Sequence, residues 1–296
     1  MKTARWRDWS CDIVVAASDS ATVATAARVV GREMRRIGRA VSRFDEASEV
    51  CRIAWSEETT HLVSPALAHS VRAALWAAEA TDGLLDPTLG RALVSHGYDR
   101  TIGDVRRGAA RGPRPARVDW RDIDLDGDVL SLPAGTLLDL GATAKALTAD
   151  RAAARAAEAG TGPCLVAIGG DVAVAGPAYA WPIAVSELPG HPAEETVTTY
   201  AGGVATSSVL ARRWSVEGAD AHHLLDPRTR CPARSPWRTA TVLASSCLAA
   251  NVASAAAILR GAGACDWLEK RHLPARLVST GGAITRTIAW PTEAAA

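Results

Sequence analysis

The sequence predicts an α+β fold, arranged as one domain of two lobes over residues 1–296. Apolar runs typical of strands alternate irregularly with stretches typical of helices, without the repeated βαβ period of a Rossmann fold. No internal repeat is visible. The chain has 296 residues, 48% of them hydrophobic and 22% charged, which is enough for a sizeable core and excludes disorder, collagen and coiled coil.

The N-terminal part shows clear periodic patterns. Cys11 to Ala17 is a short apolar run, and from Asp19 to Ser42 apolar residues recur at helical spacing opposite an arginine-rich face. The stretch 106–117 is rich in Gly, Pro and Arg and favours a solvated loop over a binding tail. The predicted elements are a strand at 11–17, a helix at 19–42, a helix at 65–80 ended by the turn 81–83, and the turn-like segment LLDPTLG at 84–90.

The C-terminal part predicts more strands than helices. Turn residues and changes of period separate the elements. The helix after residue 143 has Thr143 as its expected N-cap and Gly160 as its stop. The predicted elements are strands at 123–132 and 136–140, a helix at 144–159, two strands within 164–175 broken at Gly169-Gly170-Asp171, strands at 182–186, 195–199, 203–207 and 238–244, a helix at 246–260 closed by Gly261, and a strand pair at 275–278 and 283–289.

Charge and cysteine usage exclude several classes of protein. With 33 Lys and Arg against 32 Asp and Glu, the chain has no bulk charge for nucleic acid, and no nucleic-acid partner is expected. The six cysteines show no CxxC or CxxH spacing, which predicts reduced, mostly buried thiols without a zinc site or disulfide framework. The charged N-terminus is unlike a signal peptide, and no apolar run reaches the ~18–20 residues of a membrane span. We therefore expect a soluble cytoplasmic protein.

The chain uses Phe and Lys sparingly. Phe44 is the only Phe, and Lys145 is one of three Lys among 33 basic residues. A residue type that the chain otherwise avoids is more informative where it does occur.

The segment 137–150 places Asp139 at the end of an expected strand, before a small-residue turn that leads into a helix. Such a turn exposes backbone N–H groups to a ligand. Lys145 would lie in the first helical turn, where a cation opposes the helix dipole by some tenths of a kcal/mol. Two interpretations stay open: a lysine that contacts phosphate or pairs with a carboxylate, and a solvated surface side chain.

Two other segments carry polar residues in suggestive places. Asn251 and Ser254 share one face of an otherwise apolar helix, and a core hydrogen-bond pair is favoured there over a ligand site. His223 and Asp226 have HxxD spacing beside His222 and Arg228, which suits a histidine oriented by a carboxylate, although Asp-Pro-Arg-Thr is also an ordinary turn sequence. LLDPTLG is open to the same ordinary explanation.

The order of seven segments along the chain is more specific than any one of them. The segments are SRFDEASEV (42–50), TDGLLDPTLG (81–90), DLGATAKALTAD (139–150), AIGGDVAVAG (167–176), ATSSVLARRW (205–214), HHLLDPRTR (222–230) and AANVASAAAILRG (249–261). Together they resemble the ApbE family of FAD:protein FMN transferases, over about residues 8–290. The resemblance implies mostly antiparallel sheets packed with helices and FAD bound in a cleft between the two lobes. It also implies a magnesium-dependent reaction in which FMN passes from FAD to a Ser or Thr hydroxyl of an acceptor protein and AMP leaves.

The resemblance also assigns expected roles to residues. His223 and Asp226 match the motif expected to supply the general base or to orient the acceptor hydroxyl, and Ala142 matches a residue whose backbone carbonyl binds the metal. The positions that match FAD contacts are Phe44, Leu85, Asp86, Thr88, Asp139, Lys145, Gly170, Asp171, Leu224 and Leu225.

The departures from the family pattern concentrate on the metal. Asn251 stands where the family has Asp, and Ala255 where it has Thr, with the hydroxyl of Ser254 one place earlier. Two unit charges at ~4 Å interact by about 4 kcal/mol at an effective dielectric of ~20, so losing one carboxylate predicts Mg²⁺ affinity weaker by about three decades. Asn251 keeps a carbonyl oxygen, and Ser254 would replace the missing hydroxyl if the helix were slightly rotated.

Two further departures fall in turns. Asp8-Trp9-Ser10 replaces the family's Met-Gly-Thr, where Trp9 would stack on the flavin or the adenine, and Arg230 replaces the glycine that closes the DPRTG turn.

Three hypotheses follow from these matches and departures. The first is an FMN transferase that uses FAD and Mg²⁺. The second is a family member that binds FAD with weak or no transfer, as a flavin carrier or sensor, because Asn251 and Ala255 replace the metal-site residues. The third, a structural paralogue without flavin, is the least favoured because Phe44, Asp139 and Lys145 are retained.

Overall fold

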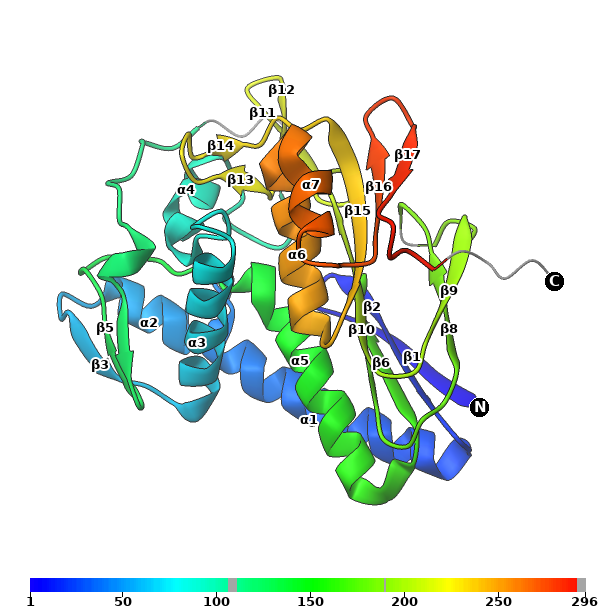
Figure 1. Cartoon of the computed structure of the whole chain (residues 1–296). Helices are drawn as coiled ribbons and strands as arrows, with labels where there is room; N and C mark the ends of the chain where they lie inside the picture. Colours follow the sequence, from blue (N-terminus) through cyan, green and yellow to red (C-terminus); the bar gives the residue numbers. More distant parts are fainter. Residues whose placement is uncertain (106–110, 189, 292–296) are drawn as a thin grey trace. The chain divides into compact units, whose positions relative to one another are not determined.

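The computed structural model describes residues 1–105, 111–188 and 190–291 and divides the chain into two compact units (Figure 1). The first unit comprises Met1–Glu33, Lys145–Ala211 and Arg234–Ala296, and the second comprises Met34–Ala144 and Arg212–Ala233. Each unit combines helices with antiparallel sheets, which confirms the predicted α+β class. The single domain over residues 1–296 stays a prediction.

An eight-stranded antiparallel sheet forms the centre of the first unit. Its strand order is β1-β2-β6-β7-β10-β15-β16-β17, and a separate hairpin, β8–β9, accompanies it. The strands are β1 (Lys2–Asp8), β2 (Cys11–Ala17), β6 (Cys164–Ile168), β7 (Asp171–Ala175), β8 (Trp181–Val185), β9 (Glu195–Thr199), β10 (Gly202–Ser208), β15 (Trp237–Ala244), β16 (Ala275–Ser279) and β17 (Ile284–Arg286).

Side chains alternate between the two faces of this sheet, as the pleat requires. Val204 of β10 packs into an apolar cluster with Trp181 and Ile183 of the β8–β9 hairpin. Ser207, an odd number of residues further along β10, instead bonds to Ser254 of helix α6 (Cys247–Arg260). The hairpin and α6 therefore cover opposite faces. The short helices η4 (Gly261–Gly263) and α7 (Ala264–Glu269) follow α6.

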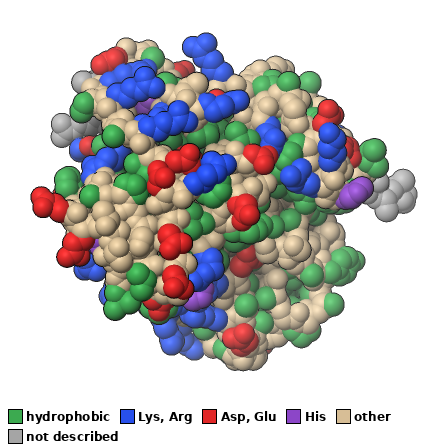
Figure 2. Space-filling view, turned by 60° about the vertical axis from the view of Figure 1, so that its left-hand side comes forward, with side chains coloured by type: hydrophobic (Ala, Val, Ile, Leu, Met, Phe, Trp, Pro, Cys, Tyr) green, Lys and Arg blue, Asp and Glu red, His purple; other side chains and the backbone are tan. Residues whose placement is uncertain are grey.

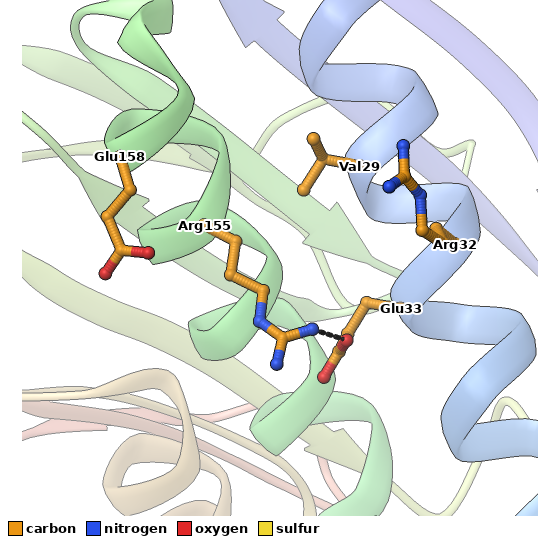
Figure 3. A pocket seen from close by; sticks show the side chains of 5 residues that line it. All are labelled: Val29, Arg32, Glu33, Arg155 and Glu158. Carbon is orange, nitrogen blue, oxygen red and sulfur yellow. Dashed lines mark hydrogen bonds and ion pairs between the residues drawn. The ribbon is translucent and has the colours of Figure 1, made fainter.

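A buried carboxylate links two long helices through ion pairs. The helices are α1 (Ser20–Val41) and α5 (Gly141–Ala156). The side chain of Glu33 is 1% exposed, and it accepts hydrogen bonds from Arg151 at 2.9 Å and from Arg155. Figure 3 shows Arg155 of α5 pointing across to Glu33 of α1. Because an ionised carboxylate is costly to bury unless it is paired, these arginines are what allow Glu33 to lie in the interface. The hollow in Figure 3 is lined by Val29, Arg32, Glu33, Arg155 and Glu158.

The second unit is mainly helical, with small sheets. A three-stranded sheet has the order β3-β5-β4, and two hairpins, β11–β12 and β13–β14, come from its second chain segment. Its elements are α2 (Glu49–Trp55), β3 (Thr60–Leu62), α3 (Pro65–Ala80), η1 (Pro87–Leu89), α4 (Gly90–Ser95), η2 (Trp120–Asp122), β4 (Asp124–Asp126), β5 (Val129–Ser131), β11 (Arg213–Val216), β12 (Ala219–His222), β13 (Leu225–Asp226) and β14 (Cys231–Pro232).

Most predicted elements are confirmed where periodicity is strong. The predicted helix 65–80 is α3 at the same bounds, and the predicted helix 246–260 is α6, capped by Ser246 and closed by Gly261 at φ +63°. The Gly169-Gly170-Asp171 break between β6 and β7 is also as predicted.

Three predicted elements are wrong in extent. The segment 123–132 is not one strand but two, β4 and β5, joined by a turn at Gly127. The segment 136–140 pairs with no strand in the described part of the chain, because its hydrogen bonds go to nearby turns, as from Asp139 N–H to the Pro87 carbonyl. Helix α5 begins at Gly141, so Thr143 lies inside its first turn and is not its N-cap.

The predicted loop at 106–117 falls partly outside the described residues, at 106–110, while 111–117 contains neither helix nor strand.

Helical residues Cys247–Glu269 are long and apolar enough to cross a membrane by length and composition alone. However, 61% of their most apolar window is buried inside the protein, as in the core helix of a folded domain. Acidic and basic side chains both occur on the face shown in Figure 2, in keeping with the formal net charge of +1.

Candidate functional site

A buried arginine organises the turn that contains Phe44. The Arg43 side chain is 4% exposed, and its guanidinium lies 4.4 Å from the Phe44 ring centre and 4.6 Å from that of Tyr98. It also donates a hydrogen bond to the Tyr98 carbonyl. Phe44 meets Tyr98 edge to face, and Tyr98 stacks on Trp214 at 4.8 Å. Phe44 is 39% exposed, so it is the accessible end of this aromatic row.

Asp139 is held between this turn and the start of α5. Its Oδ1 lies 3.7 Å from Arg43 Nε and accepts the Gly141 N–H at 2.9 Å. A carboxylate at a helix N-terminus satisfies an otherwise unpaired N–H and interacts favourably with the helix dipole. Ala142, the expected carbonyl metal ligand, is the second residue of α5 and is exposed. Lys145 is the fifth residue and therefore lies beyond the first turn where the sequence placed it.

The LLDPTLG segment is a capped turn packed against the Asp139 segment. Asp86 Oδ1 accepts hydrogen bonds from the Thr88 N–H at 2.8 Å and the Thr88 hydroxyl at 2.7 Å. Burial raises the pKa of Asp86, although these two hydrogen bonds oppose the rise. A Cβ on Gly90 would lie 2.2 Å from the Leu137 carbonyl, so glycine is required for this close packing. Leu85 is buried beside the turn.

The HHLLDPRTR segment forms the β12, β13 and β14 strands and the turn between the last two. Both carboxylate oxygens of Asp226 accept hydrogen bonds from the Arg228 guanidinium, at 2.8 and 2.9 Å. This pairing lowers the pKa of Asp226 and keeps it ionised. Leu224 and Leu225 are buried, and His223 is half-buried between β12 and β13. The catalytic assignment of His223 and Asp226 stays a prediction.

The two turns that depart from the family pattern, at Trp9-Ser10 and at Arg230, have positive φ angles, a conformation that glycine favours. Arg230 has φ +59°, and its guanidinium donates to the carbonyls of Pro115 and Ala116, both at 3.0 Å. Trp9 and Ser10, at φ +49° and +57°, form the two-residue turn of the β1–β2 hairpin. Two consecutive residues at positive φ are typical of the type I′ hairpin turn. Stacking of Trp9 on a flavin or an adenine stays a prediction.

The first unit contains a buried polar contact centred on Asn251. Asn251 Nδ2 donates to Asp171 Oδ1 at 2.9 Å, where Asp171 is 3% exposed at the start of β7. Ser254 Oγ bonds to the Asn251 carbonyl at 3.0 Å and lies 2.8 Å from Ser207 Oγ. Gly170, just before Asp171, is required because a Cβ there would lie 2.9 Å from the Thr206 carbonyl.

A second carboxylate, Asp150 of α5, binds the start of α6. Its two oxygens accept the N–H groups of Cys247 at 2.8 Å and Leu248 at 2.9 Å. Burial raises the pKa of the Cys247 thiol well above its ordinary value; the negative charges of Asp171 and Asp150 add to the rise, and Lys145 opposes it. The charges of Lys145, Asp150 and Asp171 therefore all act on the N-terminus of α6.

The donor atoms do not fit a dedicated magnesium site. Ala255 is buried and offers only a methyl group, and the Ser254 hydroxyl is engaged with Ser207 and the Asn251 backbone. Only Asn251 Oδ1 is left as a buried oxygen without a hydrogen-bond partner in this group. Within residues 1–105, 111–188 and 190–291, no three His, Cys, Asp or Glu side chains are grouped to hold a metal. Mg²⁺ takes about six oxygen ligands and usually includes carboxylates, so one neutral oxygen falls far short.

The structure thus brings the sequence-predicted residues together in two groups. In the second unit, Phe44 and Asp139 meet through Arg43; in the first, Lys145, Asp171 and Asn251 surround the start of α6. Sequence reasoning missed Arg43 and Asp150. Arg43 directly precedes Phe44, the chain's only Phe, and this adjacency is the one local signal for it. Asp150 acts on a residue 97 positions away and has no local signal.

Comparison with known proteins agrees with this fold. The family model described as "ApbE family" matches residues 8–277. The crystal structure of an ApbE protein from Thermotoga maritima is 28% identical, with a TM-score of 0.81 and 97% of each chain covered. The flavinyl transferase ApbE of Pseudomonas stutzeri, in its apo form, is 21% identical, with a TM-score of 0.77 and coverage of 97% of this chain and 95% of the other. The flavin transferase ApbE of Vibrio cholerae is 19% identical, with a TM-score of 0.76 and coverage of 98% and 97%.

No curated protein sequence matches the chain. The fold and its relatives define an α+β protein with an ApbE-like fold. The chain belongs to the ApbE family, which confirms the resemblance seen in its motifs.

Proposed function

We propose that this protein transfers FMN from FAD to a Ser or Thr hydroxyl of an acceptor protein and releases AMP. Family membership over residues 8–277 supports the class of reaction. For this chain, FAD as the donor and a Ser or Thr hydroxyl as the acceptor group are themselves part of the proposal.

The observation that carries the proposal is the position of two matched residues relative to helix α5: Asp139 lies just before the helix, and Lys145 is its fifth residue. Asp139 holds the first N–H of the helix, and Lys145 lies one turn later beside the start of α6. In a chain that otherwise selects Arg, a lysine there is suited to neutralising the pyrophosphate of a dinucleotide. Preorganised cations of this kind supply much of the catalysis in phosphoryl transfer.

The reaction breaks one bond of the pyrophosphate and forms one phosphoester. The acceptor oxygen attacks the phosphorus on the FMN side, the bond from that phosphorus to the bridging oxygen breaks, and AMP leaves with that oxygen. The hydroxyl proton passes to a base, for which we propose His223. Asp226 keeps the adjoining turn in place through its paired hydrogen bonds from Arg228. The participation of Mg²⁺ in the reaction stays a prediction.

Phe44 is proposed to contact the flavin. Its ring is exposed on one side and supported on the other by Arg43 and Tyr98, so a planar ligand has a rigid aromatic surface to pack against.

A second function is supported by the substituted positions of α6. Neither Asn251 nor Ala255 supplies a carboxylate that could hold a metal ion beside FAD. A protein of this kind would bind FAD with weak or no transfer, as a flavin carrier or sensor. The two functions share FAD binding and differ only in turnover.

The test is to incubate the purified protein with FAD and a candidate acceptor protein, once with Mg²⁺ and once with EDTA. Transfer predicts an acceptor heavier by one FMN less one water, as phosphoester formation requires, and a matching release of AMP. Lys145→Met should lower the rate about 100-fold, as expected for loss of one preorganised charge. Lys270→Met, which removes an exposed lysine, is the matched control and should leave the rate unchanged.

Phe44→Ala should weaken FAD binding about tenfold, the usual scale for losing one stacking contact. FAD binding without labelled acceptor or AMP under either condition would refute transfer and favour the carrier or sensor. No FAD binding at all would refute both.

A further inference from the structure

Five polar side chains form a connected group in the first unit, which we call the α6 cluster: Lys145, Asp150, Asp171, Asn251 and Ser254. Two of them are carboxylates and one is a cation. Asp150 accepts two N–H groups at the start of α6, and Asn251 Nδ2 donates to Asp171 at 2.9 Å. Asn251 and Ser254 belong to α6 itself, and the N-terminus of this helix adds a positive partial charge of about half a unit.

The charges of the α6 cluster are nearly balanced by the protein itself. The negative charges of Asp150 and Asp171 and the positive charge of Lys145 all act on Cys247 at the α6 N-terminus, where Asp150 also accepts the Cys247 N–H. Asn251 adds no charge. A carboxylate at position 251 would instead put a third negative charge at hydrogen-bond distance from Asp171, which a buried site tolerates only with a cation between the two.

The orientation of the Asn251 amide follows from its partner. If the amide were turned over, Oδ1 would face Asp171 Oδ1 as one acceptor against another, so Nδ2 must point to the carboxylate. Asn251 therefore occupies Asp171 Oδ1 with a neutral donor, on the side where a bridging cation would have to sit.

We infer that Asn251 takes the place of a divalent cation as the partner of Asp171, so that Asp171 needs no resident Mg²⁺. The part of this inference that concerns FAD, namely that FAD binds without Mg²⁺, depends on the proposed function. The part that concerns the metal does not.

The metal part is tested on the full chain without FAD. After EDTA treatment and removal of the chelator, MgCl₂ is titrated into the protein by calorimetry, and the thermal midpoint is measured in EDTA and in millimolar MgCl₂. The wild-type protein should show no saturable heat and the same midpoint in both. Asn251→Asp should bind Mg²⁺ about 1,000-fold more tightly, from the gain of one unit charge near Asp171. At about ten times its Kd, Mg²⁺ should then raise the midpoint of this variant by about 3–6 °C.

Ser245→Asp is the matched control, because it adds the same charge at an exposed position just before α6. It should gain no Mg²⁺ dependence. Saturable Mg²⁺ binding to the wild-type protein would overturn the inference. The wild-type titration decides this point even if Asn251→Asp fails to fold.

The FAD part is tested by titrating FAD into the wild-type protein and following flavin fluorescence in EDTA and in MgCl₂. Equal affinities support the inference, whereas binding only with MgCl₂ overturns it. If FAD binds under neither condition, the proposed function fails, and the calorimetry still decides the metal part.

Discussion

Replacing Arg43 should destabilise the second unit strongly. Its guanidinium is almost fully buried, between two aromatic rings and beside Asp139. A hydrogen bond from a charged group contributes about 1.5–3 kcal/mol, each ring contact about 0.5–1 kcal/mol or more when desolvated, and the 3.7 Å pair with the partly exposed Asp139 about 1 kcal/mol or less. Because these contributions are not additive, we expect Arg43→Ala to cost about 3–5 kcal/mol.

Urea unfolding followed by circular dichroism measures this cost. Arg43→Lys keeps the charge but loses the planar group that stacks on both rings, so it should cost about half as much. Arg100→Ala is the control: that arginine is 46% exposed in its pair with Asp99, and its loss should change stability by less than about 0.5 kcal/mol. An Arg43→Ala variant within about 1 kcal/mol of wild type would refute the argument, and a lysine variant as stable as wild type would show that charge, not stacking, matters.

Two further predictions concern pH and thiol reactivity. Burial lowers the pKa of His96 and His222, so as the pH falls these histidines take up protons in the unfolded chain before they do so in the folded protein. Their contribution to the free energy of unfolding should therefore be fully present above about pH 6.5 and should be lost as the pH falls below that value. Urea titrations at descending pH measure this, and stability that rises on acidification over this range would contradict it. Exposed Cys231 should react with iodoacetamide in the native protein, whereas Cys164, whose pKa burial raises to about 11, and Cys247 should react only after unfolding. Timed mass spectrometry measures the reaction, and native labelling of Cys247 at the rate of Cys231 would mean that the start of α6 is not buried.

Local sequence signals predicted the helices well where capping and periodicity agreed. Helix α6 has Ser246 before it and Gly261 after it, and both act as predicted, because a cap interacts with residues only three or four positions away. The same local logic misplaced the start of α5. The sequence predicts Thr143 as the cap, whereas in the structure Asp139 accepts the Gly141 N–H, and Asp139 is itself positioned by Arg43. A local rule could not weigh that distant arginine.

The prediction of a strand at 136–140 is wrong for a related reason. Its composition suits a strand, but β structure requires a partner, and this segment hydrogen-bonds to the Pro87 turn instead. Short apolar runs carry no information about which segment will lie beside them.

The sequence by itself determined the α+β class, most helices and central strands, and the family, because all of these depend on local periodicity or on the order of motifs along the chain. Only the tertiary structure decided the partners of the buried polar groups. Asn251 and Asp171 are 80 residues apart, Asp150 and Cys247 are 97 apart, and Arg43 and Tyr98 are 55 apart. The sequence flagged Asn251 as a lost metal ligand, and the fold shows it as a neutral donor to Asp171. The physical reason is that a buried polar group is defined by the partner that packing brings to it, and packing is a property of the whole unit.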